Sequence, residues 1–121
     1  MDLKDWKFTL GAAGLSRTLQ AGVEARILAS DNVMLSHVRI PPHTETTVHS
    51  HPEEQWGILL SGSCTRIQGG EERDAKAGDA WVTPGGVPHG IRTGPEGAVI
   101  LDVFCPPRPA YRTAGSGFGN S

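Results

Sequence analysis

The amino-acid sequence predicts an all-β protein with one domain, because short runs of strand-forming residues alternate with turns and no helical period is sustained. Valine, isoleucine, leucine and threonine gather in these runs, while 16 glycines and 9 prolines mark the corners between them. Many short strands at this spacing are typical of a β-sandwich or barrel. A chain of 121 residues is long enough for one such domain with one hydrophobic core.

The first part of the chain is expected to form an arm and two strands. Residues 1–20 combine aromatic side chains with a Gly-Ala-Ala-Gly break, which indicates an N-terminal arm or a short strand. Residues 23–29 alternate apolar and polar side chains, and residues 33–40 continue with strand formers after a turn at 30–32. The proline pair at 41–42 ends this strand.

The rest of the chain is expected to add short strands that are bounded by turns containing glycine or proline. These strands are residues 55–61, 63–68, 71–77, 80–83, 90–93 and 98–105. Gly62 breaks the first pair, and residues 93–97 connect the last two. The barrel is therefore expected to span residues 21–111, followed by a flexible C-terminal tail at 112–121.

Charge and cysteine content limit the possible partners and the compartment. Lysine and arginine number 11 against 13 aspartates and glutamates, so the chain lacks the basic excess that nucleic-acid binding requires. No stretch resembles a secretory signal or a membrane span, so we expect a cytoplasmic protein with no membrane partner. Cys64 and Cys105 lie in apolar runs and are expected to be reduced, buried thiols.

A cluster of histidines predicts a metal site. His49 and His51 project to the same side of an extended segment, where two imidazoles can share one ion. Gln55 offers an amide oxygen, and His89 adds a third imidazole after a Pro/Gly turn. This set leaves positions open for water or substrate, as catalytic sites do. We expect one divalent first-row ion, for which nickel, zinc, iron and manganese remain alternatives.

Other polar residues near these ligands are expected to stay outside the site. His37 lies in an apolar strand and His43 beside the proline pair, so both are expected to be ordinary satisfied or exposed histidines. Glu53 and Glu54 are expected to be solvated, with Glu54 turned away from the metal by strand alternation. Because the four ligands are neutral, the ion would keep its full charge and favour a small anionic substrate.

These residues resemble the two motifs of the cupin superfamily. The first motif runs Gly-x5-His-x-His, three or four residues, Glu, six residues and Gly, and it corresponds here to His49, His51, Gln55 and Gly62. The second motif corresponds to Gly78, Pro84, Gly86 and His89. The chain departs from the pattern with His43 for glycine, Gln55 for glutamate and Thr93 for asparagine. The resemblance implies a single cupin barrel with a jelly-roll topology and the metal ligands named above.

The stretch 102–108 carries a second group of candidate residues. Asp102 and Phe104 share one face of the last strand, and Arg108 follows a proline pair that restricts its backbone. One interpretation is a buried Asp-Arg pair that closes the barrel edge. The other is an acid/base at Asp102, a stacking wall at Phe104 and a carboxylate clamp at Arg108.

Together with residues 49–55, this stretch resembles the small cupins of the KdgF type, which act in pectin and alginate breakdown. The resemblance implies ring opening and ketonisation of 4,5-unsaturated monouronates. A metal-dependent dioxygenase of the quercetinase or cysteine-dioxygenase kind, or a cupin that only binds a small molecule, remains the alternative. We also expect a homodimer, because an open jelly-roll of this size leaves sheet edges and an aromatic arm to be covered.

Overall fold

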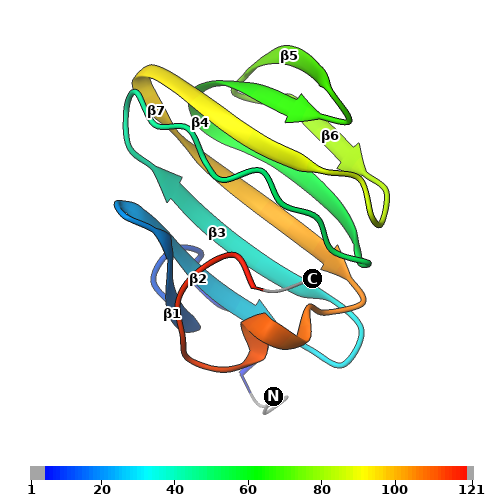
Figure 1. The fold of residues 1–121 in the computed structure, drawn as a ribbon. Coiled ribbons are helices and arrows are strands. Elements are labelled where there is room, and N and C mark those ends of the chain that lie inside the picture. The colour runs from blue at the N-terminus through cyan, green and yellow to red at the C-terminus, as the bar shows by residue number, and fades with distance from the viewer. Residues whose placement is uncertain (1–4, 120–121) are drawn as a thin grey trace.

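The computed structural model describes residues 5–119, and within this range the strands form one antiparallel sheet that curls into a barrel. The elements are β1 (Leu15–Gln20), β2 (Val23–Ala29), β3 (Met34–Ile40), β4 (Glu54–Gln68), β5 (Glu71–Lys76), β6 (Ala80–Thr83), β7 (His89–Cys105) and the 3₁₀ turn η1 (Pro109–Arg112). The strand order is β1-β2-β3-β7-β4-β5, and β6 also pairs with β4. Figure 1 shows β3, β7 and β4 side by side, with the remaining strands on either flank. The all-β prediction is confirmed, and the architecture is consistent with a single jelly-roll.

Strands β4 and β7 are longer than the sequence predicted. We expected Gly62 to break the first of them and residues 93–97 to separate two strands, but both strands continue and pair with each other on either side of these points. Gly62 has a φ of +82°, and a Cβ there would lie 2.1 Å from the Gly97 carbonyl oxygen. Only glycine tolerates both conditions, so the chain bends at this point without ending the strand.

The core lies between the two halves of the curled sheet and follows the alternation that the sequence shows. On β2, Val23, Ala25 and Ile27 are buried while Glu24 and Arg26 are exposed. Met34 on β3 lies opposite Phe104 on β7, and both side chains are almost fully buried. Burying a side chain of this size contributes about 1.5–3 kcal/mol relative to leaving it in water. The core therefore fixes the inward face of β7, on which Asp102 and Phe104 lie.

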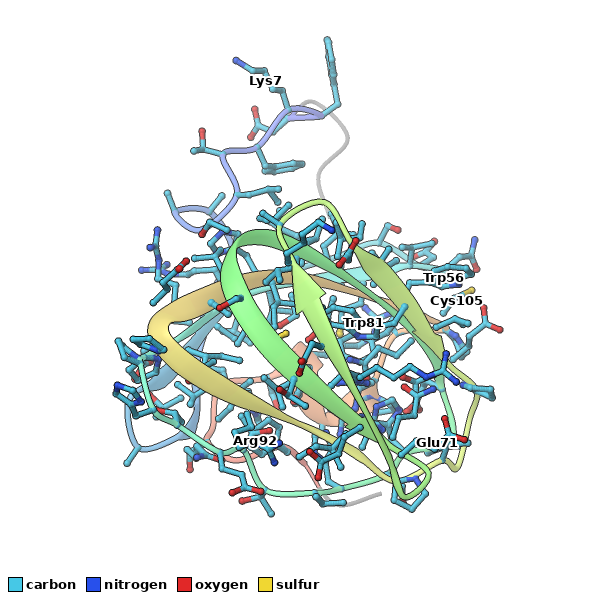
Figure 2. All side chains as sticks on the ribbon, turned by 90° about the horizontal axis from the view of Figure 1, so that it is seen from above. Lys7, Trp56, Glu71, Trp81, Arg92 and Cys105 are labelled. Atoms are coloured by element: carbon cyan, nitrogen blue, oxygen red, sulfur yellow. The ribbon has the colours of Figure 1, made fainter. Side chains whose placement is uncertain are left out.

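The N-terminal arm projects from the barrel, whereas the C-terminal segment packs against strand β1. Residues 1–20 were expected to form an arm or a short strand, and residues 15–20 of this range form strand β1, which pairs with β2. The preceding residues around Lys7 stand away from the barrel in Figure 2, and Trp6 is 82% exposed. At the other end, residues 113–119 return to β1, where Ser116 forms a parallel bridge with Thr18. Residues 1–4 of the arm and 120–121 of the tail lie outside the described part of the chain, and the flexibility of the tail stays a prediction.

The two cysteines have different environments, and the prediction for one of them is wrong. Both thiols are free, and Cys64 is only 5% exposed, as expected. Cys105 is exposed, because it ends β7 at the rim of the barrel, where Figure 2 shows it at the molecular surface. Within residues 5–119, no helix is long and apolar enough to span a bilayer.

Candidate metal centre

Backbone pairing brings the two histidine motifs together. His49 and His89 form an isolated antiparallel bridge, in which each residue donates its N–H to the carbonyl of the other at 3.0 and 2.9 Å. The Gly86 N–H donates to the His51 carbonyl at 2.8 Å, so the Pro/Gly turn also holds the second histidine of the His49–His51 pair. Backbone hydrogen bonds thus hold together three histidines that come from two distant parts of the sequence.

The three imidazoles converge in an orientation that suits a cation. The ligand atoms of His49, His51 and His89 lie within 4.8 Å of one another. Each Nδ1 lies near the carbonyl oxygen of a residue two positions away: His49 and Thr47 at 3.0 Å, His51 and Glu53 at 3.1 Å, His89 and Val87 at 2.8 Å. These contacts favour a proton on Nδ1, which leaves Nε2 free to bind a metal. The His89 Nε2 atom is buried without a hydrogen-bond partner.

Gln55 completes the set of oxygen and nitrogen donors. Its Oε1 lies 2.8 Å from the Nε2 atom of His51, and the interaction of its side chain with Asp102 lowers the pKa of that carboxyl. Because a carboxylate only accepts, the amide nitrogen faces Asp102 and the oxygen faces the imidazoles. An imidazole nitrogen without a proton and an amide oxygen at this distance repel each other unless a cation lies between them. The cluster is therefore compatible with a bound metal ion.

The histidines are also in the protonation state that metal binding needs. Burial lowers the pKa of His49 to about 4 and that of His89 to about 3, and it lowers the pKa of His51 in the same direction. All three imidazoles are consequently neutral near neutral pH, so a metal ion does not have to displace protons from them.

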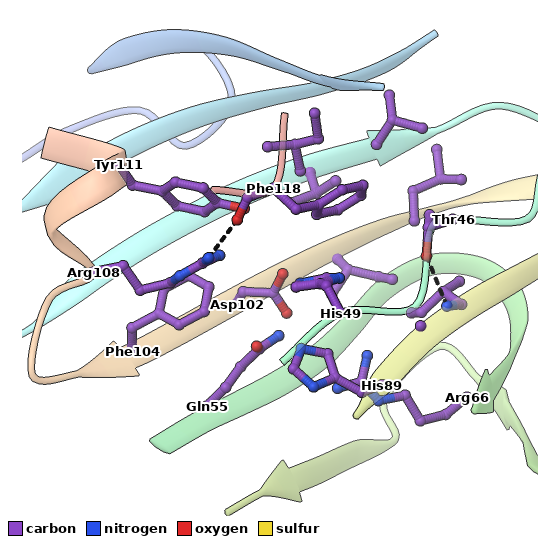
Figure 3. A pocket seen from close by; sticks show the side chains of 17 residues that line it. Thr46, His49, Gln55, Arg66, His89, Asp102, Phe104, Arg108, Tyr111 and Phe118 are labelled. Atoms are coloured by element: carbon purple, nitrogen blue, oxygen red, sulfur yellow. Dashed lines mark hydrogen bonds between the residues drawn. The ribbon is translucent and has the colours of Figure 1, made fainter. Parts of the chain in front are cut away.

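One cavity with a volume of about 40 Å³ is lined by most of the residues expected at the site (Figure 3): His49, Gln55, His89, Asp102, Phe104 and Arg108. His51 is not part of its lining. Phe104 lies opposite Gln55 in the β4–β7 register, and Asp102 lies opposite Gly57. Burial raises the pKa of the Asp102 carboxyl to about 6, although the positive charge of Arg66 opposes this shift. The candidate acid/base thus lies beside the candidate ligand Gln55.

Arg108 reaches the cavity from the segment after β7. It is 2% exposed, and its guanidinium lies 4.1 Å from the centre of the Tyr111 ring and 5.5 Å from that of Phe104. Its Nη2 atom donates to the Phe118 carbonyl, whereas Nη1 is buried without a partner. A buried guanidinium with a free donor is a ready binding position for an anion.

One prediction about the acidic neighbours is wrong. Glu54 is exposed as expected, but the Glu53 side chain is only 11% exposed, and its carboxylate lies 3.6 Å from His51 Nδ1 and 3.9 Å from Arg108 Nε. Strand alternation from Gln55 already places residue 53 on the inner side, so the sequence contained this signal. Glu53 therefore belongs to the surroundings of the site, where it balances part of the charge of Arg108.

Two further residues of the cavity were not identified from the sequence. Arg66 is 6% exposed, and its Nη2 donates to Thr83 Oγ1 at 2.7 Å. Its inward position follows from alternation with the buried Cys64 two residues earlier. Phe118 stacks on His49 with ring centroids 4.4 Å apart, and no local pattern in its glycine-rich surroundings indicates this contact.

The departures from the two motifs have structural explanations. His43 has a φ of +52°, the left-handed conformation that glycine adopts most easily, so its backbone takes the shape that the motif glycine permits. The Thr93 hydroxyl accepts the Thr44 N–H at 2.9 Å and donates to the Pro41 carbonyl at 2.7 Å. It thereby holds the loop that leads to the first histidine pair. His37 and His43 lie outside the three-histidine cluster.

Comparison with known proteins agrees with this architecture. The family model described as "Cupin domain" matches residues 36–104. The pectin degradation protein KdgF of Dickeya dadantii is 32% identical over 92 residues, which are 74% of this chain and 84% of that protein. The oxalate decarboxylase OxdC of Bacillus subtilis is 33% identical over 81 residues, which are 62% of this chain. This chain spans only 21% of the length of OxdC.

A solved structure supports the same fold. The structure of KdgF from Halomonas sp. superposes with a TM-score of 0.76 at 24% identity, covering 87% of this chain and 97% of that one. At this level of identity the similarity concerns the fold alone. The family model, however, covers more than half of the sequence and includes the three histidines of the cluster. The chain belongs to the cupin family.

Proposed function

We propose that the protein is a metal-dependent enzyme that opens and ketonises 4,5-unsaturated monouronates. The observation that carries this proposal is Arg108, a buried cation with a free Nη1 donor beside a cluster of neutral metal-binding side chains. An anionic substrate would complete this site, because it satisfies the free donor of a guanidinium whose charge Glu53 balances only in part. The similarity to KdgF of Dickeya dadantii over most of both chains supports the choice of a uronate.

His49, His51, Gln55 and His89 would hold the metal ion. A divalent ion bound by these neutral ligands would act as a strong Lewis acid, lowering the pKa of a coordinated hydroxyl and stabilising negative charge on oxygen. Histidine and amide ligands suit several first-row ions, so elemental analysis of the protein as purified is the test of the metal's identity.

The reaction requires only proton transfers and one bond cleavage. The hydroxyl on C1 of the cyclic substrate loses its proton, the C1–O5 bond breaks, and C1 becomes an aldehyde. The electron pair of the broken bond goes to O5, which leaves an enolate with its double bond between C4 and C5. The enolate then gains a proton at C4 and becomes a ketone at C5, so the product is an isomer of the substrate and no oxidant is needed.

Three side chains have roles in this scheme. Arg108 would bind the substrate carboxylate, and Phe104 would form the wall against which the ring lies. Asp102, which faces the cavity beside Gln55, would accept the C1 hydroxyl proton and return a proton to C4. No other carboxylate lines this cavity among residues 5–119, which supports the assignment to Asp102.

The test is to follow loss of the ultraviolet absorbance of a freshly prepared 4,5-unsaturated monouronate with metal-loaded and metal-free protein. We expect clear acceleration by the loaded protein only. A rate equal to that of the spontaneous reaction with a full metal complement would reject the proposal. Oxygen uptake measured in the same samples separates an isomerase from a dioxygenase, because only the latter consumes oxygen.

We also propose that the protein is a homodimer. Large apolar side chains remain exposed on the single chain, including Trp6 at 82%, Trp56 at 47% and Leu60 at 43%. Exposed aromatic and leucine side chains of this size are often covered by a second subunit. Light scattering at micromolar concentration should give about twice the chain mass of 12.8 kDa, and the single-chain mass would reject the dimer.

A further inference from the structure

The C-terminal segment after η1 lies over the cavity and is tied to β1. The Arg17 guanidinium, 6% exposed, donates to four carbonyl oxygens: Ala110 at 2.9 Å, Thr113 at 3.4 Å, Ser116 at 2.9 Å and Gly117 at 2.9 Å. The Gly117 N–H also donates to the Thr18 carbonyl at 2.8 Å. A buried charge with this many backbone partners anchors the segment as far as Gly117.

Beyond this anchor, the segment contacts the residues that the proposed function uses. The Phe118 ring stacks on His49, and its carbonyl accepts a hydrogen bond from Nη2 of Arg108 (Figure 3). Gly119 also lies against this guanidinium, since a Cβ there would be 2.9 Å from Nη2. A backbone carbonyl therefore occupies a donor that would otherwise face an anionic ligand.

The remaining space is too small for a sugar acid. The cavity measures about 40 Å³, whereas ligand sites usually measure about 300–1,000 Å³. Phe118 forms part of the cavity wall, next to His49 and Arg108. A uronate therefore enters only when Phe118 moves.

Gly117 offers a pivot for this movement. Its φ is +85°, and a Cβ there would meet nothing within 4 Å, so no side chain at or beside this position blocks a turn of the chain that follows the anchored backbone of Gly117. Arg17 holds the chain up to this residue. Beyond Gly117, the stack on His49 and the bond to Arg108 hold the chain in place. Hinges of lids are a few loop positions that absorb the change in backbone angles, often at small residues such as glycine.

We propose that Phe118 and Gly119 form a lid that occupies the anion position at Arg108 in the free protein and is displaced by the carboxylate of the substrate. A carboxylate carries a full negative charge and can accept two parallel hydrogen bonds from a guanidinium, which a single backbone carbonyl cannot, so an anion displaces the lid while a neutral sugar does not. Phe118 is then a specificity-determining residue. This inference rests on the proposed role of Arg108 as the substrate clamp.

The decisive comparison is between the full chain and a chain that ends at Gly117, which keeps every carbonyl that Arg17 binds. Calorimetry with galacturonate, a saturated uronate, should show about tenfold tighter binding to the shortened chain, because the cost of opening the lid has been removed. Galactose, which lacks the carboxylate, should bind neither chain. Phe118→Ala in the full chain keeps the backbone carbonyl and loses only the stack on His49, so its affinity for galacturonate should increase by less than tenfold. Arg108→Ala in the shortened chain should abolish galacturonate binding.

Unchanged or weaker galacturonate binding by the shortened chain, or no binding to either chain, would overturn the lid. A second measurement on the intact protein does not depend on how the shortened chain folds. Hydrogen exchange of the C-terminal peptide should become faster with galacturonate and stay the same with galactose, and equal or slower exchange would contradict the proposal. If galacturonate opens the segment but the protein does not turn over the unsaturated uronate, the proposed function alone is rejected. If the protein turns over the uronate at the same rate with and without the lid, the lid alone is rejected.

Discussion

His49 and His89 are bridge partners, and each donates its backbone N–H to the carbonyl of the other across a gap of forty positions in the sequence. This pairing fixes the distance between the two histidine motifs before any ion binds. Because Nδ1 of each ring also faces a backbone carbonyl, the rings themselves are oriented. The three-histidine cluster is thus preorganised by the backbone, which would reduce the conformational cost of binding a metal ion.

The first prediction concerns the metal ligands. Replacing His51 or His89 with alanine should lower metal affinity by more than the roughly 10–100-fold that loss of a supporting residue costs, because a direct ligand is removed. His43→Ala is the matched control, since His43 lies outside the cluster and should leave metal content unchanged. Elemental analysis after dialysis measures the outcome. Stoichiometric metal in both cluster variants would mean that the ligand set is wrong.

The second prediction concerns the proton transfer. Asp102→Asn keeps the size of the side chain and removes its ability to accept a proton, so kcat should fall by about 10²–10⁴ while the metal stays bound. Asp74→Asn serves as a control, because Asp74 accepts a hydrogen bond from Thr65 on the exposed side of the barrel. A loss of metal in the Asp102 variant, or a kcat near that of the native protein, would contradict the assignment.

The third prediction concerns the carboxylate clamp. Arg108→Ala should mainly raise KM, because the guanidinium binds the substrate carboxylate equally in the ground state and the transition state. Arg112→Ala is the control, since this exposed arginine only donates to the Ser30 carbonyl. Steady-state kinetics separates the two parameters. A selective fall in kcat with KM unchanged would show that Arg108 acts on the chemical step instead.

The fourth prediction concerns the two thiols and pH. Burial raises the pKa of Cys64 to about 11, so its reactive thiolate stays scarce until the solution is strongly alkaline. The exposed Cys105 should therefore be alkylated first at about pH 8, and Cys64 labelling should increase only as pH rises toward its pKa. Mass spectrometry of the labelled peptides at several pH values tracks both sites. Equal labelling near neutral pH would contradict the burial of Cys64.

The burial of Cys64 also affects stability in a defined direction. Its pKa is higher in the folded protein than the ordinary value of 9.0, so the unfolded chain loses this proton first as pH rises. The buried, protonated Cys64 thiol therefore makes its full contribution to the free energy of unfolding below pH 9.0. This contribution is lost as the pH rises toward 11. Cys64→Ala should remove this part of the alkaline destabilisation, which denaturant unfolding at several pH values would measure.

Local patterns in the sequence were sufficient for most strands and for the inward face that carries the site. Alternation placed Asp102 and Phe104 together, and the same rule would have placed Glu53 and Arg66 had it been applied to them. It could not show that β4 continues through Gly62, because the pairing of that residue depends on a partner strand far along the chain. Bends of this kind are decided by tertiary pairing.

The contact between Phe118 and His49 had no signal in the sequence at all. The surrounding residues are small and rich in glycine, a composition typical of a mobile tail. Their position depends on Arg17, which lies about one hundred residues earlier and binds their carbonyl oxygens. Because the acceptors are backbone carbonyls, these hydrogen bonds leave no pattern in the side chains of the segment. Only the folded structure therefore reveals the segment over the cavity.

The central claim is that the metal-loaded protein controls the ketonisation of an unsaturated uronate. The most direct measurement is nuclear magnetic resonance of the product formed in heavy water, with the metal-free protein as the control. Proton delivery by Asp102 to one face of the enolate predicts a single deuterium at C4 with one configuration, formed faster than in the spontaneous reaction. Deuterium in both configurations at the spontaneous rate would contradict the account.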